Sequence, residues 1–326
     1  MKPSVLISQR IFDEAVSIAR HHFEVDLNEN EIPLSPADLI QRLQHKKGAI
    51  VLLTDRIGEG VLSQCPWLKI ICNVAVGYNN IDVEACSRRG VVVTNTPGVL
   101  DDTTADFTWA LLMATARRVV EADRFLRSLQ WKGWNLMEFL GCDVHHKVLG
   151  ICGFGRIGQR VARRAKGFDM KILYTGTARR APAIEKELGA EFVDKKELLS
   201  KSDFVTLHVP LFQDTIHYIS HAELAFMKPT SILINTSRGP VVDEKALVQA
   251  LREGKIAGAG LDVYEREPEV EPELIPLRNV VLAPHIGSAS RETRLRMATM
   301  AAENLVAGLT GKRPPNLVNP EVLVEI

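Results

Sequence analysis

Short apolar runs alternate with longer amphipathic segments along the whole chain. This alternation is expected when crossover helices cover both faces of a mainly parallel sheet, so it predicts the α/β class. Ser35 followed by Pro36 is typical of a helix N-terminus between two such runs. The strands expected in the first hundred residues are Ser4 to Ile7, Phe23 to Leu27, Ala49 to Leu53, Leu68 to Cys72 and Val91 to Thr94.

A second series of apolar runs predicts a second, complete sheet. Its expected strands are Lys147 to Cys152, Lys171 to Tyr174, Glu191 to Val193, Phe204 to Leu207, Ile232 to Asn235, Gly258 to Val263 and Val280 to Ala283. A long apolar helix from about Ala105 to Arg117 is expected between the two series, and an amphipathic helix, roughly Ser290 to Leu309, after the second. We expect this last helix to return to the first sheet. The predicted domains are therefore residues 1–99 with 289–326, and residues 100–288.

Composition narrows the kind of partner. The 326 residues exceed the usual single-domain size of about 100 to 200 residues, which agrees with two domains. Forty basic and forty acidic residues give a net charge of zero. Because such a chain has no bulk attraction to nucleic acid or to an anionic membrane, a small-molecule partner is favoured.

The five cysteines argue for a cytoplasmic protein with reduced thiols. Their number is odd and no C-x-x-C occurs, which argues against a disulfide framework and a zinc knuckle. The chain also has no H-E-x-x-H motif, so no metal site is expected. No stretch reaches the roughly 20 apolar residues that a membrane span needs, and the N-terminus does not look like an export signal.

A glycine-rich turn carries the first functional signal. The expected strand ending at Cys152 leads into Gly153-Phe154-Gly155-Arg156-Ile157-Gly158, and residues 159–168 have helical periodicity. In this context the first glycine permits a tight turn, the second lets the backbone approach a pyrophosphate, and the third lets helix pack on strand. A flexible loop is the alternative, but the strand before and the helix after it favour a dinucleotide site.

The next strand indicates which dinucleotide is bound. Such sites usually show Asp or Glu at its end, to accept from the ribose 2′-hydroxyl. Here the strand is followed by Thr175, Gly176 and, after two more residues, by Arg179 and Arg180. A missing carboxylate and two arginines favour NADPH, with NADH still possible. In the alternative interpretation, the arginines begin a solvated loop before Pro182.

Three segments downstream place polar groups at expected strand ends, where parallel sheets gather their ligands. Arg238 is suited to hold a carboxylate with its planar fork, although alone it could form a surface salt bridge. His285 can donate a proton near neutral pH, as ketone reduction requires. Glu267 could bond to the other ring nitrogen, favouring imidazolium and fixing its orientation. Asp262 is expected near the nicotinamide or as a group that tunes this pair.

Competing candidates are weaker. His208 follows an expected strand and is expected to line the cofactor cleft. Seven histidines lie in polar or helix-flanking contexts and are expected at the surface: His21, His22, His45, His145, His146, His217 and His221. A hydrolase is not indicated, because Ser237 lies in no G-x-S-x-G turn.

These motifs resemble those of the D-isomer-specific 2-hydroxyacid dehydrogenases, nearest to the glyoxylate/hydroxypyruvate reductase and 2-ketogluconate reductase branch. The resemblance covers nearly the whole chain. Position 79 is Asn where many relatives carry Asp, and position 177 is Thr where some NADPH users carry Arg. The matching segments are residues 74–82, 94–100, the glycine motif, and residues 236–239, 261–268 and 284–288.

The resemblance implies a Rossmann cofactor domain and a flavodoxin-like substrate domain with a cleft between them, and a homodimer formed through the cofactor domain. It implies that Arg238, Glu267 and His285 are catalytic. The implied substrate contacts are Leu53, Val76, Gly77, Arg238 and His285, with the N–H groups of Val76 and Gly77 on the carboxylate. The expected cofactor contacts are Thr104, Gly153, Phe154, Gly155, Arg156, Ile157, Gly158, Thr175, Gly176, Arg179, Arg180, His208, Val209, Pro210, Thr215, Thr236, Ser237, Arg238, Asp262, His285, Gly287 and Ser288.

The expected reaction is reduction of a small 2-oxo acid to the D-2-hydroxy acid. Glyoxylate and hydroxypyruvate are the first candidates and 2-ketogluconate the next. The alternatives are a family member that acts on D-3-phosphoglycerate, formate, phosphite or a branched 2-oxo acid, and a dinucleotide-sensing co-repressor or scaffold. The pocket wall is expected to draw on Leu52, Leu53, Val76, Tyr78, Trp134 and Met137.

Overall fold

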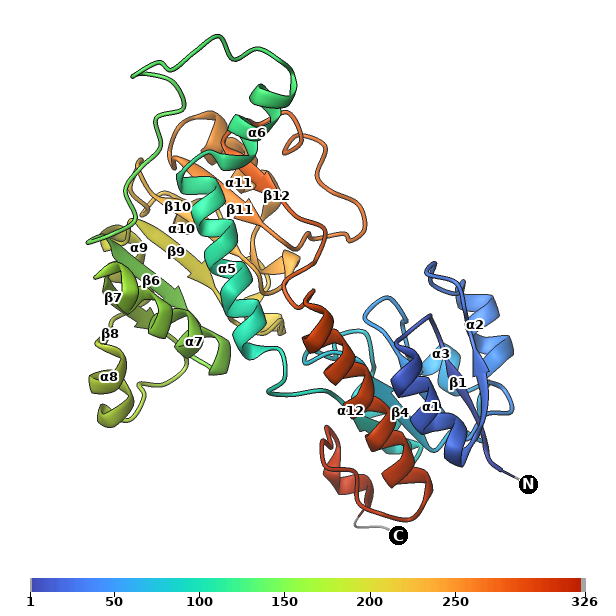
Figure 1. The fold of residues 1–326 in the computed structure, drawn as a ribbon. Helices are drawn as coiled ribbons and strands as arrows, with labels where there is room; N and C mark the ends of the chain where they lie inside the picture. Colours follow the sequence, from blue (N-terminus) through green and yellow to red (C-terminus); the bar gives the residue numbers. More distant parts are fainter. Residues whose placement is uncertain (1, 324–326) are drawn as a thin grey trace. The chain divides into compact units, whose positions relative to one another are not determined.

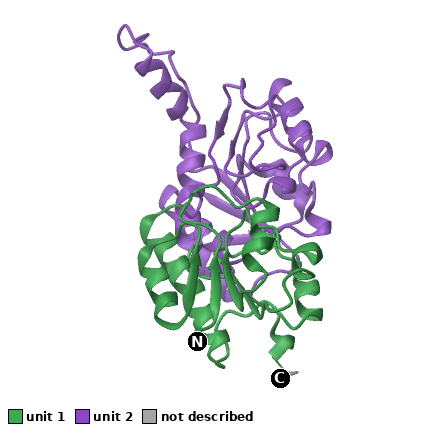
Figure 2. Cartoon of the chain, turned by 90° about the vertical axis from the view of Figure 1, so that its right-hand side faces the viewer, with its two compact units in different colours: residues 1–100, 289–326 green, residues 101–288 purple. Residues whose placement is uncertain are grey.

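A computed structural model describes residues 2–323 and shows two compact units (Figure 2). Unit 1 comprises Met1–Leu100 with Ala289–Ile326, and unit 2 comprises Asp101–Ser288. Each is built on one parallel sheet covered by helices on both faces (Figure 1). Met1 and residues 324–326 of the expected first domain lie outside the described residues.

The sheet of unit 1 has five parallel strands in the order β2-β1-β3-β4-β5. This is the strand order of flavodoxin-like folds. The strands are β1 (Ser4–Ile7), β2 (Glu24–Leu27), β3 (Gly48–Val51), β4 (Ile70–Asn73) and β5 (Val92–Thr94).

Alternating side chains of these strands fill two cores. On one face, α1 (Asp13–His22) and α12 (Arg291–Leu309) cover Val5, Ile7 and their neighbours. On the other face, Leu6 and its neighbours pack under α2 (Pro36–Leu43), α3 (Glu59–Leu62) and α4 (Val83–Arg88). The chain thus returns after unit 2 to add α12 to the first sheet, and a 3-10 helix, Pro320–Leu323, follows it.

The sheet of unit 2 has seven parallel strands in the order β12-β11-β10-β9-β6-β7-β8. Because β6 lies between β7 and β9, the strand order reverses there, and the carboxyl ends of these strands form a ligand-binding crevice in such folds. The strands are β6 (Val148–Cys152), β7 (Lys171–Thr175), β8 (Ala190–Phe192), β9 (Phe204–Leu207), β10 (Ile232–Asn235), β11 (Gly258–Leu261) and β12 (Val280–Leu282).

Helices cover both faces of this sheet as well. On one face pack α5 (Asp101–Ala116), α7 (Arg156–Ala165) and α8 (Pro182–Leu188). The other face is covered by α9 (Lys195–Lys201), α10 (His221–Leu224) and α11 (Glu244–Arg252). The remaining helix, α6 (Val119–Arg127), has no buried residue. Three 3-10 helices span Lys166–Phe168, Gln213–Thr215 and Gly239–Val241.

The predicted fold class is confirmed, and all twelve expected strands are present within two residues of their expected ends. The helix starts differ more. α7 begins at Arg156, inside the glycine motif, and α5 already begins at Asp101. Its two first-turn carboxylates, Asp101 and Asp102, favour this earlier start because they interact well with a helix N-terminus. Within the described residues, no helix is long and apolar enough to cross a membrane.

Candidate active site

The turn between β6 and α7 requires its glycines. Gly153 has φ +91°, and a Cβ there would lie 2.6 Å from the backbone of His208. A Cβ at Gly158 would lie 2.3 Å from the carbonyl oxygen of Gly153. At Gly155, by contrast, a Cβ would meet nothing within 4 Å, so the backbone is open on that side. The turn is therefore tight against the sheet and accessible where a ligand would approach.

This turn fits a dinucleotide. Among residues 2–323, no protein acceptor pairs with the N–H groups of Gly155, Arg156 and Ile157 at the start of α7. Such unpaired donors at a helix N-terminus form an anion site. The Nε2 atom of His208 is buried and has no partner within the described chain, and burial lowers the pKa of this imidazole to about 3. The free N–H groups can bind the phosphates of a dinucleotide, and the neutral imidazole can form a hydrogen bond with another of its polar groups.

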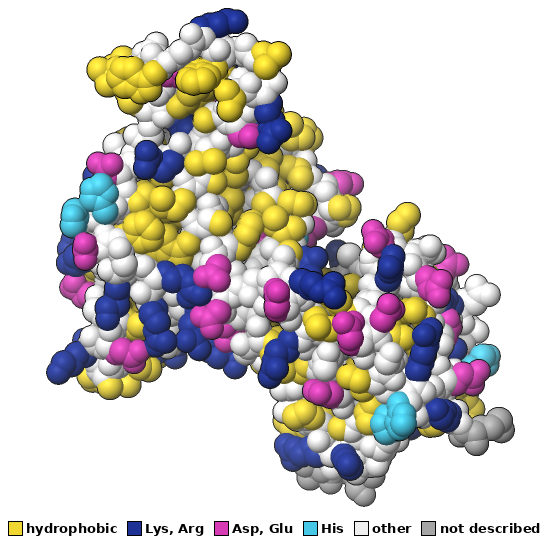
Figure 3. All heavy atoms as spheres, viewed as in Figure 1, with side chains coloured by type: hydrophobic (Ala, Val, Ile, Leu, Met, Phe, Trp, Pro, Cys, Tyr) yellow, Lys and Arg dark blue, Asp and Glu magenta, His cyan; other side chains and the backbone are white. Residues whose placement is uncertain are grey.

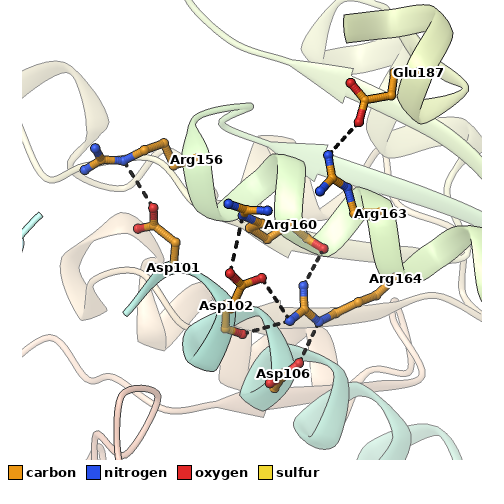
Figure 4. A network of polar contacts seen from close by, with 8 residues as sticks. All are labelled: Asp101, Asp102, Asp106, Arg156, Arg160, Arg163, Arg164 and Glu187. Carbon is orange, nitrogen blue, oxygen red and sulfur yellow. Dashed lines mark hydrogen bonds and ion pairs between the residues drawn. The ribbon is translucent and has the colours of Figure 1, made fainter. Parts of the chain in front are cut away.

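An ion-pair network fixes α7 to α5 (Figure 4). Arg164 bridges Asp102 and Asp106 of α5 at 3.3 and 2.6 Å. Arg160 adds a second contact to Asp102 at 3.6 Å, and Arg163 reaches Glu187 of α8. The structure pairs Arg156, expected to contact the cofactor, with Asp101 at 3.2 Å. A network of this kind holds the glycine turn in place more firmly than isolated surface pairs could.

The two arginines after β7 have different partners. Arg179 forms a bidentate pair with Glu185, so the positive charge of Arg179 is already neutralised. Glu185 also accepts a hydrogen bond from Tyr174. Hydrogen bonds from Arg179 and Tyr174 hold the pKa of Glu185 below its usual value. Arg180 instead donates through Nε to the carbonyl of Phe154 in the glycine turn at 2.9 Å. Its terminal nitrogens have no protein acceptor within the described residues.

The other expected cofactor contacts lie at the carboxyl ends of β9, β10 and β12. His208, Val209 and Pro210 follow β9, and the hydroxyl of Thr215 supports this loop by donating to Pro210 at 2.7 Å. Thr236 bonds to Thr108, and Ser237 donates to Asn235. Gly287 lies where a Cβ would be 3.0 Å from Asp262 and 3.6 Å from Thr104. Thr175 and Gly176 end β7, and Ser288 closes unit 2.

A histidine–glutamate pair forms after β11 and β12. Nδ1 of His285 lies 2.8 Å from Oε2 of Glu267, whose other oxygen accepts from the N–H of Tyr264 at 3.0 Å. Burial acts to raise the pKa of Glu267, but the bond and charge of His285, the Tyr264 N–H and the charge of Arg238 outweigh it, so the net pKa is lowered. The carboxylate therefore stays ionised and leaves Nε2 of His285 for a ligand.

The loop of His285 is held in an uncommon conformation. His285 has φ +54°, in the left-handed region. Asp262 stabilises it by accepting from the N–H groups of Ile286 and Gly287 at 2.7 and 2.8 Å. Burial raises the pKa of Asp262, and these two N–H groups oppose that rise. Asp262 thus orients the loop, a role that the sequence did not specify.

Arg238 lies with this pair. Arg238 is half-buried, and this desolvation lowers its pKa, an effect that the charge of Glu267 partly offsets. It donates to the carbonyl of Ser237 at 2.7 Å. A Cβ on the next residue, Gly239, would lie 1.8 Å from the backbone of Tyr264, so only glycine lets the two loops meet. The structure therefore brings Arg238, Glu267 and His285 together at one edge of the sheet.

Glu244 supports this cluster and was not identified from the sequence. At the start of α11 it accepts from the N–H of Glu265 at 3.0 Å, while its own N–H donates to Glu265 at 2.9 Å. Glu244 is only 4% exposed, and burial raises its pKa. The reciprocal bonds clamp the loop that carries Glu267. An acidic residue in a first helical turn is common, so the sequence gives no specific signal for this contact.

The expected substrate contacts of unit 1 lie in two loops at the carboxyl ends of its strands. Leu53 follows β3 and is 37% exposed. Val76 and Gly77 follow β4, and their N–H groups donate to no protein acceptor among residues 2–323. These loops can therefore offer an apolar side chain and backbone donors. No cluster of metal-ligating side chains occurs within the described residues.

Known proteins are similar to this chain over nearly its full length. Residues 109–287 match the family model "D-isomer specific 2-hydroxyacid dehydrogenase, NAD binding domain". The chain is 53% identical over 327 residues to the glyoxylate reductase of Thermococcus onnurineus (99% of this chain, 98% of the relative). It is 55% identical over 326 residues to that of Korarchaeum cryptofilum (99% and 98%).

Solved structures agree. The TT0316 protein of Thermus thermophilus has a TM-score of 0.90 and 42% identity, covering 97% of this chain and 99% of its own. An NADPH-dependent glyoxylate/hydroxypyruvate reductase of Sinorhizobium meliloti, in complex with NADP and malonate, has a TM-score of 0.85 and 32% identity (98% and 97%). With its glycine turn and its polar cluster at the ends of β10 to β12, the chain belongs to the D-isomer-specific 2-hydroxyacid dehydrogenase family and is an NAD(P)-binding oxidoreductase.

Proposed function

We propose that this enzyme reduces glyoxylate and hydroxypyruvate to the corresponding 2-hydroxy acids, D-glycerate in the second case, with NADPH as the preferred cofactor. The observation that carries the proposal is the grouping of Arg238, Glu267 and His285 in the unit that holds the glycine turn. Relatives at about 50% identity are glyoxylate reductases, which favours the same substrate class here.

Each group has a chemical task. When bound, the reduced nicotinamide supplies a hydride to the carbonyl carbon of the substrate. His285 donates the proton from Nε2 to the carbonyl oxygen, and Glu267 holds the ring through Nδ1. Arg238 binds the carboxylate and polarises the carbonyl. The N–H groups of Val76 and Gly77 bind the carboxylate as well.

A direct assay tests the assignment. Purified protein is mixed with glyoxylate, hydroxypyruvate or 2-ketogluconate, and loss of reduced-nicotinamide absorbance is followed with NADPH and NADH in parallel. Fast turnover of glyoxylate and hydroxypyruvate supports the proposal, and chiral analysis of the glycerate formed tests the D configuration. Cofactor binding without turnover of any of the three acids would contradict it.

The NADPH preference rests on Arg180. β7 ends without the carboxylate that usually accepts from the ribose 2′-hydroxyl. Arg180 is docked on the glycine turn with its terminal nitrogens free of protein acceptors in the described chain, so it can bind a 2′-phosphate. Arg179 is less suited, because Glu185 neutralises it.

Replacing Arg180 is therefore expected to weaken the binding of NADPH but not that of NADH. We expect Arg180→Ala to raise the KM for NADPH by about 10-fold or more, as for loss of one charged hydrogen bond, and to leave the KM for NADH nearly unchanged. The matched control is Arg179→Ala with Glu185→Gln, which removes a neutralised pair and keeps an acceptor for Tyr174. Steady-state kinetics with both cofactors gives the comparison, and equal effects of the two variants would exclude Arg180 as the discriminating residue.

Glu267 is expected to set the pH range of the reduction. In the wild type the rate should fall as pH drops through the lowered pKa of Glu267, because the protonated carboxyl no longer offers Nδ1 of His285 a charged acceptor. Glu267→Gln has no titrating carboxyl and should lack this decline. Because the pKa of Glu267 is lowered, the wild-type carboxylate stays ionised in mild acid, and the stability it contributes is lost only as pH falls through that lowered value. Rate–pH profiles of both proteins decide the matter, and superimposable profiles would refute this role.

A second copy of this chain is the proposed partner. The segment 119–140, which includes α6, projects from the body of unit 2, and hydrophobic side chains gather over it (Figures 2 and 3). Large apolar patches on a monomer mark interaction sites, and Trp is enriched at interfaces. Light scattering should give the mass of a dimer, and a monomer would contradict the proposal. The exposed residues are Val119, Leu126, Leu129, Trp131, Trp134, Leu136, Met137 and Leu140.

The cytoplasm is the proposed compartment. All five cysteines are unpaired in the structure, and four of them are buried: Cys65, Cys72, Cys86 and Cys152. Free thiols that lie in the core are expected where the surroundings are reducing.

A further inference from the structure

The loop after β4 presents three consecutive unpaired N–H groups. Those of Val76, Gly77 and Tyr78 donate to no protein acceptor within residues 2–323. Successive backbone N–H groups that face one side form a concave anion site. The loop is partly exposed at all three residues, so an anion can reach it. The loop lies outside helices and strands, so contacts of another kind fix the direction of these groups.

The carbonyl oxygens of residues 75, 76 and 77 in the same loop each accept a hydrogen bond. The Ala75 oxygen accepts from the N–H of Thr96 at 2.9 Å. The Val76 oxygen accepts from Nδ2 of Asn95 at 2.8 Å, and the Gly77 oxygen accepts from Nδ2 of Asn73 at 2.9 Å. Three successive peptide groups are therefore fixed from their carbonyl side.

The peptide geometry then sets the direction of the donors. In a planar trans peptide, the C=O bond and the following N–H point in opposite directions. Holding the oxygens of residues 75, 76 and 77 thus also fixes the N–H groups of residues 76, 77 and 78, each pointing away from the group that holds the oxygen of its peptide. Two of the three donors to these oxygens are side-chain amides, those of Asn95 and Asn73.

The amide of Asn73 and the backbone of Asn95 are themselves anchored. Asn73 is fully buried, and its Oδ1 lies 3.3 Å from Nδ2 of Asn80, which also donates to the carbonyls of Leu52 and Asp55 at 3.0 Å. The N–H of Asn95 donates to Asn316 at 3.2 Å, and its carbonyl accepts from Asn304 of α12 at 3.4 Å. The side chain of Asn73 is thus fixed by Asn80, and the backbone of Asn95 by the segment that returns to unit 1.

We propose that Asn95 and Asn73 are positioning residues that aim the N–H groups of Val76, Gly77 and Tyr78 at the substrate carboxylate, with Tyr78 as a third donor. This rests on the proposed function, because the carboxylate of a 2-oxo acid is the anion concerned. Neither asparagine touches the reacting atoms. Their effect is on carboxylate affinity, while proton and hydride transfer depend on groups of unit 2.

The test uses Asn95→Asp in the full-length enzyme. Aspartate has the same shape but no Nδ2 donor, so the Val76 carbonyl loses its hold. We expect the KM for glyoxylate to rise about 10-fold or more, as for loss of a hydrogen bond to a charged group, with kcat and the KM for NADPH changing by less than about three-fold. Calorimetric titration with oxalate, without cofactor, should show a matching loss of affinity.

A matched control separates the lost donor from the added charge. Asn95→Ser adds no charge, and its side chain is too short to reach the Val76 carbonyl, so it removes the donor alone. We expect its KM for glyoxylate to rise about as much as that of Asn95→Asp. Asn95→Ser alone carries the test if Asn95→Asp does not fold.

The outcomes are distinguishable. An unchanged KM and oxalate affinity in Asn95→Asp, an unchanged KM in Asn95→Ser, or a fall in kcat alone would overturn the proposal. If the wild-type enzyme does not reduce glyoxylate, the proposed function fails, whereas the oxalate titrations still test whether Asn95 orients an anion-binding loop.

Discussion

Replacing His285 with asparagine is expected to lower kcat for glyoxylate reduction by about 100-fold to 10,000-fold, the range found when a general acid is removed. Nδ1 of His285 bonds to Glu267 at 2.8 Å, which leaves Nε2 as the proton donor. Asparagine is chosen because His285 has φ +54°, and asparagine tolerates this left-handed conformation better than most residues. The measurement is kcat at saturating glyoxylate and NADPH.

His217 offers a closely matched control. It too has a left-handed backbone, with φ +52°, and its Nε2 lies 3.1 Å from a glutamate, Glu265. Because His217 lies at no strand end of the polar cluster, His217→Asn should change kcat by less than about three-fold. If the His285 variant kept a wild-type kcat, or if both variants lost activity equally, His285 would not be the proton donor.

The strands and the motif residues could be predicted because both follow local rules. Apolar runs marked all twelve strands. Gly153, Gly155 and Gly158 have meaning through their spacing alone, and the polar residues after β10, β11 and β12 meet because parallel strands end at one edge of a sheet. Arg238, Glu267 and His285 could therefore be selected together although 47 positions separate the first from the last.

The supporting contacts could not be predicted because they depend on partners far away in the sequence. Glu244 looks like an ordinary first-turn acid, and its bond to the backbone of Glu265 exists only once β11 lies beside β10. Asn95 and Asn73 reach carbonyls rather than side chains, so no pairing of charges or motifs marks them.

Arg179 and Arg180 show the same limit at adjacent positions. The sequence predicts the same role for both, a positive charge near the end of β7, because it shows no difference between two neighbouring arginines. In the structure Glu185, six residues after Arg179, neutralises Arg179 but does not pair with Arg180. Which charge is available to a ligand is thus decided by the start of α8, not by the composition of the loop.

The second large effect is expected from Arg238→Lys. Lysine keeps the charge but loses the planar fork that can bind carboxylate and carbonyl oxygens together. Arg238 is also half-buried, and this desolvation already lowers its pKa, so a flexible ammonium there would be less well solvated than in water. We expect kcat/KM for glyoxylate to fall by about 100-fold to 1000-fold, as when a transition-state donor is removed. Affinity for NADPH, measured by fluorescence titration, should change by less than about three-fold.

Arg266 provides the control for this substitution. It lies on the adjacent loop, is 60% exposed and pairs with Glu271 at 3.2 Å, so Arg266→Lys makes the same chemical change outside the cluster. Lysine at this exposed position keeps the charge that pairs with Glu271, so this variant should keep its kcat/KM within about three-fold. A near-normal rate in Arg238→Lys would mean that positive charge alone suffices and that the fork does not bind the substrate. A low rate together with lost NADPH binding would instead make Arg238 a cofactor residue.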